Sequence, residues 1–230
     1  MPNELLLILS LIFTFSAVIA AFYIFHEQGL FLWTTIAANI EALIVVDAFG
    51  MEMTLGNILF ASTFLVTDIL SELYGKKAAQ KAVYLGIVTS VFFIPISCSW
   101  LLYTPNKNDW AMPSIRTIFS NTPRLMLVGI VVYVVVQLFD VWIYHKWWEF
   151  TTKKFGDSRK YLWLRNNGST MLSQLLNTVL FTLGAFFGVY SFQTLISIMV
   201  SSYIIFVVTS LADTPFVYLA RYIYNKRFQS

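Results

Sequence analysis

The chain has 230 residues, of which 58% are hydrophobic and 12% are charged, and its formal net charge is +3. Soluble domains contain about 25% charged residues, so this composition excludes a soluble fold and predicts an all-α, polytopic integral membrane protein. The apolar runs are too long and continuous for membrane β-barrel strands, in which polar and apolar residues alternate. The single cysteine, Cys98, excludes an intrachain disulfide. The two histidines, His26 and His145, lie far apart in the sequence. We expect no metal site and no cofactor.

Seven apolar runs are the predicted membrane helices, and most reach the roughly 20 residues needed to cross the hydrocarbon layer. The second and third are the least regular, because Asp47, Gly50 and Glu52 interrupt their apolar character. The N-terminus lacks the basic residues of a signal peptide, so we expect the first run to be retained as a helix. Residues 1–230 should form a single domain, with spans at 5–25, 30–48, 54–74, 78–103, 122–145, 167–190 and 193–222.

The basic residues predict the orientation of the chain. Twelve of the fifteen lysines and arginines follow the third, fifth and seventh runs, which places them on one side of a seven-span protein. Cytoplasmic loops of membrane proteins carry such an excess of basic residues. The sequence therefore predicts an N-terminus outside the cell and a C-terminus in the cytoplasm.

Acidic residues within three of the runs point to a polar function. Asp68 and Glu72 lie four residues apart at the end of the third run, a spacing that places both on one face of a helix. An ionisable side chain at bilayer depth costs roughly 2.5–3.5 kcal/mol, so two on one face favour a lined cavity over lipid contact. Asp140 and Asp213 come at a similar level of the fifth and seventh runs. Either one could instead extend toward water or pair with a nearby lysine. A pathway for a polar solute is the leading hypothesis.

Amide side chains extend this polar set. Gln137 precedes Asp140 by three residues and shares its helical face. Gln174 and Asn177 recur with serines at helical intervals in the sixth run, and Asn39 lies in the middle of the second. Such residues also join membrane helices to one another without binding a ligand, so both interpretations stay open.

Two further residues suggest coupling or gating. Pro215 lies inside the seventh run and predicts a kink or an unwound turn, because proline removes a backbone donor and clashes with the preceding turn. Such a turn either lines a cavity or only adjusts packing. Arg165, at the beginning of the sixth run, either neutralises one of the acids or is only a topological charge.

The block Thr67-Asp-Ile-Leu-Ser-Glu-Leu-Tyr-Gly-Lys-Lys-Ala-Ala79 closely resembles the signature of the queuosine precursor transporter family, also called the vitamin uptake transporter family. Later blocks agree in order: Gln137–Trp142, Leu162–Phe181 and Leu211–Tyr218. The resemblance runs from about residue 36 to 222. One departure is Asn177, where the family pattern often has an aspartate, so this chain lacks a titratable group there.

The resemblance implies uptake of 7-deazaguanine compounds across the cytoplasmic (inner) membrane for tRNA modification. The candidates are the 7-cyano and 7-aminomethyl precursors and queuine. It also implies a six-helix core resembling the substrate-binding subunits of energy-coupling-factor vitamin transporters, with an additional N-terminal helix. No catalytic residue and no nucleic-acid partner is expected. The expected partners are the 7-deazaguanine and the lipid bilayer, and a homo-oligomer and an ATPase module are both left open.

The expected site combines the acids with the amides. A deazaguanine presents N1–H and an exocyclic amine side by side, which one carboxylate can accept as a pair. The residues expected to contact substrate are Asn39, Asp68, Glu72, Gln137, Asp140, Gln174 and Asn177, and those expected to couple or gate transport are Asp213, Pro215 and Arg165.

Two alternatives to a secondary transporter stay open. The chain could be the substrate-binding subunit of an ATP-driven vitamin or queuine uptake system. It could also be an integral-membrane enzyme in which Asp68 and Glu72 hold a metal ion. The sequence contains no HExxH, no P-loop and no serine-centred elbow, which argues against the enzyme.

Overall fold

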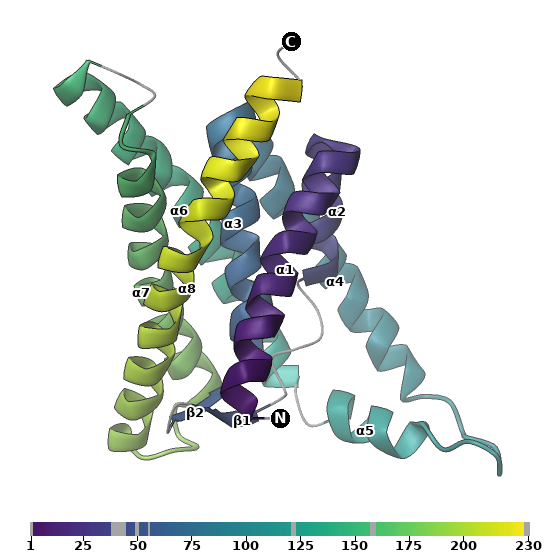
Figure 1. Cartoon of the computed structure of the whole chain (residues 1–230). Helices are drawn as coiled ribbons and strands as arrows, with labels where there is room; N and C mark the ends of the chain where they lie inside the picture. Colours follow the sequence, from purple (N-terminus) through teal and green to yellow (C-terminus); the bar gives the residue numbers. More distant parts are fainter. Residues whose placement is uncertain are drawn as a thin grey trace.

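The computed structural model shows a bundle of long helices (Figure 1). It describes residues 2–37, 45–48, 51–54, 56–120, 123–156 and 160–227. Asn39, an expected contact residue, lies outside these described residues. The predicted all-α class is confirmed. In chain order the elements are α1 Asn3–Phe25, α2 Glu27–Ala37, β1 Val45–Ala48, β2 Met51–Thr54, α3 Gly56–Tyr74, α4 Lys76–Trp100, α5 Met112–Ser120, α6 Pro123–Phe155, α7 Leu162–Phe186 and α8 Phe192–Arg227.

Very short connections join several of the long helices. Gly75 alone separates α3 from α4, and its φ of +83° is a conformation that glycine adopts without steric cost. This explains why a glycine stands between the acid pair and the lysines. Gly188, with φ of +81°, similarly lies in the short turn between α7 and α8. Such connections make consecutive helices run back along one another as antiparallel neighbours.

The second predicted span is wrong in its extent. We expected a helix over 30–48, but α2 ends at Ala37, and Val45–Ala48 instead pairs as β1 with β2. The antiparallel register places Asp47 opposite Glu52. The physical reason is local: β-branched valines favour a strand, and the interrupting acids cannot extend an apolar helix.

The fifth predicted span belongs to a helix that is longer than the span. We expected it to end at 145, whereas α6 continues to Phe155. These last residues include Lys146 and Glu149, which lie three apart and form an exposed ion pair of 3.3 Å. Amphipathic, charged sequence can continue a helix beyond the hydrocarbon layer, which hydropathy alone does not reveal.

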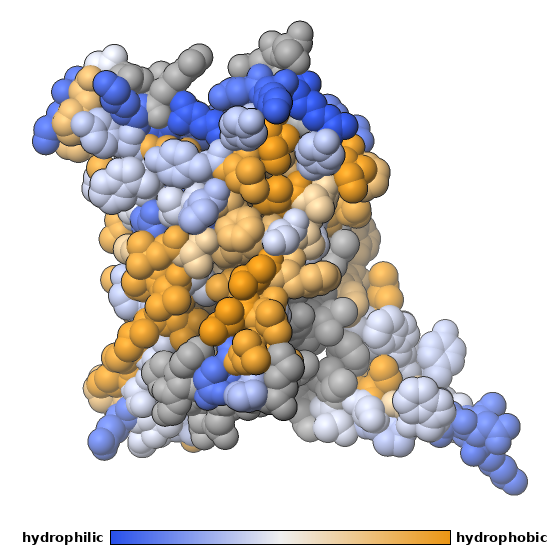
Figure 2. Space-filling model, in the orientation of Figure 1, coloured by the Kyte–Doolittle hydropathy of each residue, from blue (hydrophilic) through white to orange (hydrophobic). Residues whose placement is uncertain are grey.

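Four helices of the described chain are long and apolar enough to cross a membrane: Glu4–Phe25, Lys76–Trp100, Leu127–Phe155 and Phe192–Arg227. The more polar α3 and α7 pack against them, α3 against α1, α4, α6 and α8, and α7 against α6 and α8. On α3, Phe64, Leu65, Ile69 and Leu70 are fully buried. The apolar side chains on the visible face form a band between two hydrophilic ends (Figure 2). The protein is therefore a multi-pass membrane protein.

The termini lie at opposite ends of the bundle (Figure 1). The end that holds the C-terminus also holds the first turn of α4 and the last turn of α6. These turns and the end of α8 carry Lys76, Lys77, Lys153, Lys154, Lys226 and Arg227. We call it the lysine-rich end.

Candidate functional site

The buried side of α7 is polar rather than apolar, which is unusual for a helix inside a bundle. Only Leu162 and Ala185 among its buried residues are apolar. Because α7 packs against α6 and α8, its polar side faces the interior of the protein. The buried polar residues of α7 are Arg165, Asn166, Asn167, Ser169, Thr170, Ser173, Gln174, Asn177, Thr178 and Thr182.

Three buried carboxyl groups meet this polar side. Asp68 on α3, Asp140 on α6 and Asp213 on α8 are at most 1% exposed. The carboxyl groups of Asp140 and Asp213 lie close enough to Asp68 to act on it electrostatically. The structure thus brings together three acids that the sequence placed on different spans, and we call them the acid layer.

Hydrogen bonds to the acid layer come from α7 and are few. Thr170 Oγ1 donates to Asp68 Oδ2 at 3.1 Å, and Asn166 Nδ2 donates to Asp213 Oδ1 at 2.8 Å. Both carboxyl oxygens of Asp140 and Oδ1 of Asp68 lack a hydrogen-bond partner among the described residues. Buried carboxyl oxygens are normally paired, so these unpaired atoms identify a candidate binding position.

Asp140 also has a hydroxyl neighbour. Ser173 lies beside its carboxyl group, but the Ser173 hydroxyl donates to the backbone carbonyl of Ser169 at 2.9 Å. A hydroxyl can rotate between two such acceptors. The Ser173 hydroxyl can therefore donate to Asp140 in one state of the site and to the backbone carbonyl of its own helix in another.

The three predicted amides that lie within the described residues divide between α6 and α7. Gln137 is fully buried and donates to Thr63 Oγ1, which ties α6 to α3. Asn177 Nδ2 lies 3.4 Å from Gln174 Oε1, whereas Gln174 Nε2 has no partner among the described residues. Gln174 therefore provides an unpaired hydrogen-bond donor on α7, the helix that also donates a hydrogen bond to Asp68.

Glu72 has quite different surroundings from Asp68, one helical turn away. Arg165 binds it in a bidentate manner, with Nη2 at 2.7 Å and Nε at 3.0 Å from Oε2, and Nη2 at 2.8 Å from Oε1. Tyr144 Oη donates to Oε2 at 3.0 Å, and Arg221 Nη1 lies 3.4 Å from Oε1. We call Glu72, Arg165, Tyr144 and Arg221 the Glu72 cluster. It ties α3, α6, α7 and α8 together with charge-assisted bonds.

Arg165 is held from several sides. Its Nη1 donates to the backbone carbonyl of Lys160 at 2.8 Å, and its guanidinium lies 4.5 Å from the ring centre of Trp148. The side chain is fully buried. A planar guanidinium is suited to combine bidentate pairing with ring contact.

A neutral network joins α7 and α8 around Asp213. Asn167 Nδ2 donates to Thr214 Oγ1 at 2.7 Å, and Ser210 Oγ donates to Asn167 Oδ1 at 3.2 Å. Pro215 follows directly, but α8 is continuous through it. Of the two predicted alternatives the unwound turn is therefore wrong, because the helix continues around the missing donor, and the kink stays a prediction.

Sequence reasoning missed Asn166, Asn167, Thr170, Tyr144 and Arg221 as members of this region. Signals were available for most of them. Asn166 lies two turns and Thr170 one turn before Gln174, and Tyr144 lies one turn after Asp140. The partner of each residue lies on another helix, so spacing alone could not find it.

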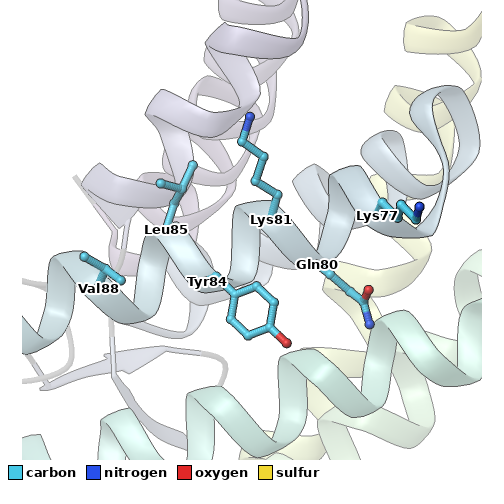
Figure 3. A pocket seen from close by; sticks show the side chains of 6 residues that line it. All are labelled: Lys77, Gln80, Lys81, Tyr84, Leu85 and Val88. Atoms are coloured by element: carbon cyan, nitrogen blue, oxygen red, sulfur yellow. The ribbon is translucent and has the colours of Figure 1, made fainter.

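The hollows of the surface lie elsewhere. One of about 270 Å³ is lined by α4 residues that include Lys77, Lys81 and Tyr84 (Figure 3). Another of about 320 Å³ borders His145, Trp148 and Lys153 on α6. Neither is lined by the acid layer. The three acids are buried, so a solute that binds them must displace some of their neighbours.

The described residues contain no group of three histidine, cysteine or acidic side chains placed to hold a metal ion. The arrangement is therefore a buried set of acids and amides between four helices of a membrane protein. Such a set serves polar solutes or protons inside a bilayer.

Comparisons with known proteins identify the class. The sequence model of the family described as "Putative vitamin uptake transporter" matches residues 54–220, which include α3–α7, most of α8 and the acid layer. The chain belongs to this transporter family. A relative from Bacillus subtilis (strain 168), named "Probable queuosine precursor transporter", is 36% identical over 200 residues, which cover 86% of this chain and 85% of the relative. No solved structure matches the chain.

Proposed function

We propose that this protein imports queuosine precursors, the 7-deazaguanines that are incorporated into tRNA, through the cytoplasmic membrane. The observation that carries the proposal is the set of unpaired atoms on Asp68, Asp140 and Gln174, which lie within the matched transporter region. The name of the B. subtilis relative supplies the substrate class. We further propose that residues 1–230 act as one transporter domain without catalytic residues.

The unpaired atoms suit the edge of a deazaguanine. Its N1–H and exocyclic amine are adjacent donors, and the two free oxygens of Asp140 can accept both. The ring carbonyl beside N1 is an acceptor, for which Gln174 Nε2 is the free donor. Asp68 Oδ1, the remaining unpaired oxygen of the layer, is available for a third polar group of the precursor. Asn177 and Gln137 then act as positioning residues, since their amides already bind protein partners.

We assign a different role to Glu72 than to Asp68. Three side chains already bind the Glu72 carboxylate oxygens. Few acceptor positions on this carboxylate are therefore left for a substrate. The Glu72 cluster closes the bundle between the four helices that carry the site. Separation of these helices must break it, so we propose that it is a gate, with Arg165 as its central residue.

The proposed orientation follows from the charges. The lysine-rich end faces the cytoplasm, because basic residues are retained on that side. The N-terminus is then outside, and the precursor travels toward the lysine-rich end.

The test is uptake in cells. A bacterial strain that cannot synthesise precursors should regain queuosine in its tRNA when it carries this gene and receives 7-cyano- or 7-aminomethyl-7-deazaguanine or queuine. Expression of the protein is verified by immunoblot. Failure with all three compounds despite normal expression would reject the proposal. Loss of uptake on deletion of an ATPase component would show instead that the chain is a subunit of an ATP-driven system.

A further inference from the structure

The acid layer lacks a counterion. The charged groups that act on Asp68 are all acidic, namely Asp140, Asp213 and Glu72. The nearby cations of α7 and α8, Arg165 and Arg221, pair with Glu72. On α6, the Tyr144 hydroxyl one turn after Asp140 also donates to Glu72, and the neutral Gln137 one turn before it donates to Thr63. Three carboxylates buried without a counterion cannot all stay ionised, because the loss of hydration and their mutual repulsion both oppose it.

A second observation indicates what is missing. Asn166 is fully buried, and its Nδ2 donates to Asp213. The Oδ1 of the same amide therefore lies beside the acid layer, and it has no hydrogen-bond partner among the described residues. This buried acceptor at the layer and the unpaired carboxyl oxygens within the layer all require a hydrogen-bond donor. A proton carried on a carboxyl group converts that group from an acceptor into such a donor.

The described acids do not form a group that could hold a metal ion, which favours a proton over a metal cation. The layer receives only one hydrogen bond on Asp68 and one on Asp213. Two or three further donors would be needed to stabilise an ionised triad. A proton fits both the charge and the space of this buried region.

We propose that Asp68, Asp140 and Asp213 form a shared proton site and that the protein carries a proton inward together with its substrate. The inference rests on the proposed function. In the loaded state Asp140 is ionised and accepts the donors of the precursor, while Asp68 and Asp213 are both protonated. One of these two protons is taken from water on the outer side and released to water in the cytoplasm, and the layer returns with the other proton shared among its acids.

The coupling has a physical cause. An ionised Asp140 is tolerated in this buried layer only when its two acidic neighbours are neutral. Protonation of those neighbours therefore favours binding of the precursor, and binding of the precursor favours protonation by the same factor. Acid outside and a more alkaline cytoplasm then drive import.

The experiment uses the purified full-length chain in liposomes. The probe is labelled 7-cyano-7-deazaguanine, which carries no aminomethyl group that could change charge with pH. Exchange of labelled for unlabelled probe at equal pH is measured first. Accumulation is then measured with an acidic exterior, with and without a protonophore, and separately with an inward sodium gradient.

We expect the pH gradient to drive accumulation above equilibrium, with a ceiling of about tenfold per pH unit for one proton. The protonophore should abolish it. Asp213→Asn should lower gradient-driven accumulation more than exchange, whereas Glu149→Gln, the same change at an exposed acid, should alter neither.

The outcomes separate the two proposals. Exchange without accumulation in a pH gradient would overturn the proton site and leave the proposed function intact. Accumulation driven only by sodium would also overturn it. No exchange at all would reject the proposed function and this inference with it. The decisive comparison uses the unmodified protein, so it does not depend on the folding of a variant.

Discussion

At the scale of single residues, two acids one turn apart on α3 perform separate tasks. Glu72 accepts hydrogen bonds from Arg165 and Tyr144, whereas Asp68 accepts one from Thr170 and keeps a free oxygen. A buried carboxylate with good partners stabilises the fold through them, and one without partners is available to a ligand. This division explains how a single helix can supply both a structural contact and a contact for the solute.

Arg165→Ala should destabilise the protein by about 3–5 kcal/mol, the cost of leaving a buried charge without its partner. The side chains of Arg165 and Glu72 are 0% and 4% exposed. Thermal unfolding in detergent measures the effect. Lys146→Ala is the control, because its pair with Glu149 is exposed and should contribute at most about 1 kcal/mol. Equal melting temperatures for the two variants would contradict the assignment of Arg165.

Asp140→Asn preserves the shape of the side chain but replaces one of its two acceptor oxygens with a donor. We expect roughly 10–100-fold weaker binding of 7-deazaguanines, since a hydrogen bond to a charged group contributes about 1.5–3 kcal/mol. The measurement is the rise in melting temperature with ligand concentration. Glu149→Gln should bind normally. An unchanged affinity for Asp140→Asn would remove this residue from the proposed site.

At the scale of elements, close backbone contact sets the geometry of the bundle. Gly29 on α2 is buried against α1, where an added methyl group would collide with the backbone carbonyl of Ala21. Backbone cannot move aside as a flexible side chain can. The first two helices therefore depend on this glycine for their packing.

Gly29→Ala should destabilise the protein by about 1–3 kcal/mol through overpacking. Gly129→Ala on α6 is the matched control, because its added methyl group would meet only the ring of Phe181, at 3.9 Å. There the helix should gain stability of up to about 1 kcal/mol. The measurement is the melting temperature of both variants in detergent. A stabilised Gly29→Ala variant would show that α1 and α2 are not packed in this way.

At the scale of the whole molecule, the opposite positions of the termini require an odd number of crossings if the protein spans the bilayer along the bundle. The lysine-rich end collects charges from α4, α6 and α8. The long α4–α5 connection, which contains Lys107, lies at the other end of α4.

Cysteine labelling in intact cells tests this orientation. In a Cys98→Ser background, Lys107→Cys should react with a membrane-impermeant maleimide, and Lys226→Cys should react only after permeabilisation. The reverse pattern would invert the topology and the proposed direction of transport. Reaction of both sites in intact cells would contradict a closed seven-span arrangement.

The sequence by itself determined the class of the protein and most of its helices. Hydropathy and 3.6-residue periodicity are local properties, so runs such as 54–74 and 193–222 closely predicted α3 and α8. The acids and amides of the site were also visible, because ionisable residues within apolar runs are costly and therefore conspicuous. The excess of basic residues after alternate runs was also visible, because charged residues stand out between apolar runs.

Only the tertiary structure decided which of these residues are partners. Arg165 and Glu72 are 93 residues apart in sequence, and Thr170 and Asp68 are 102 apart. Such pairings depend on how four helices rotate and slide against one another, which no local pattern encodes. The continuous helix at Pro215 likewise followed from its surroundings. Local chemistry thus fixed the membrane helices and their polar residues, and packing separated the Glu72 cluster from the acid layer.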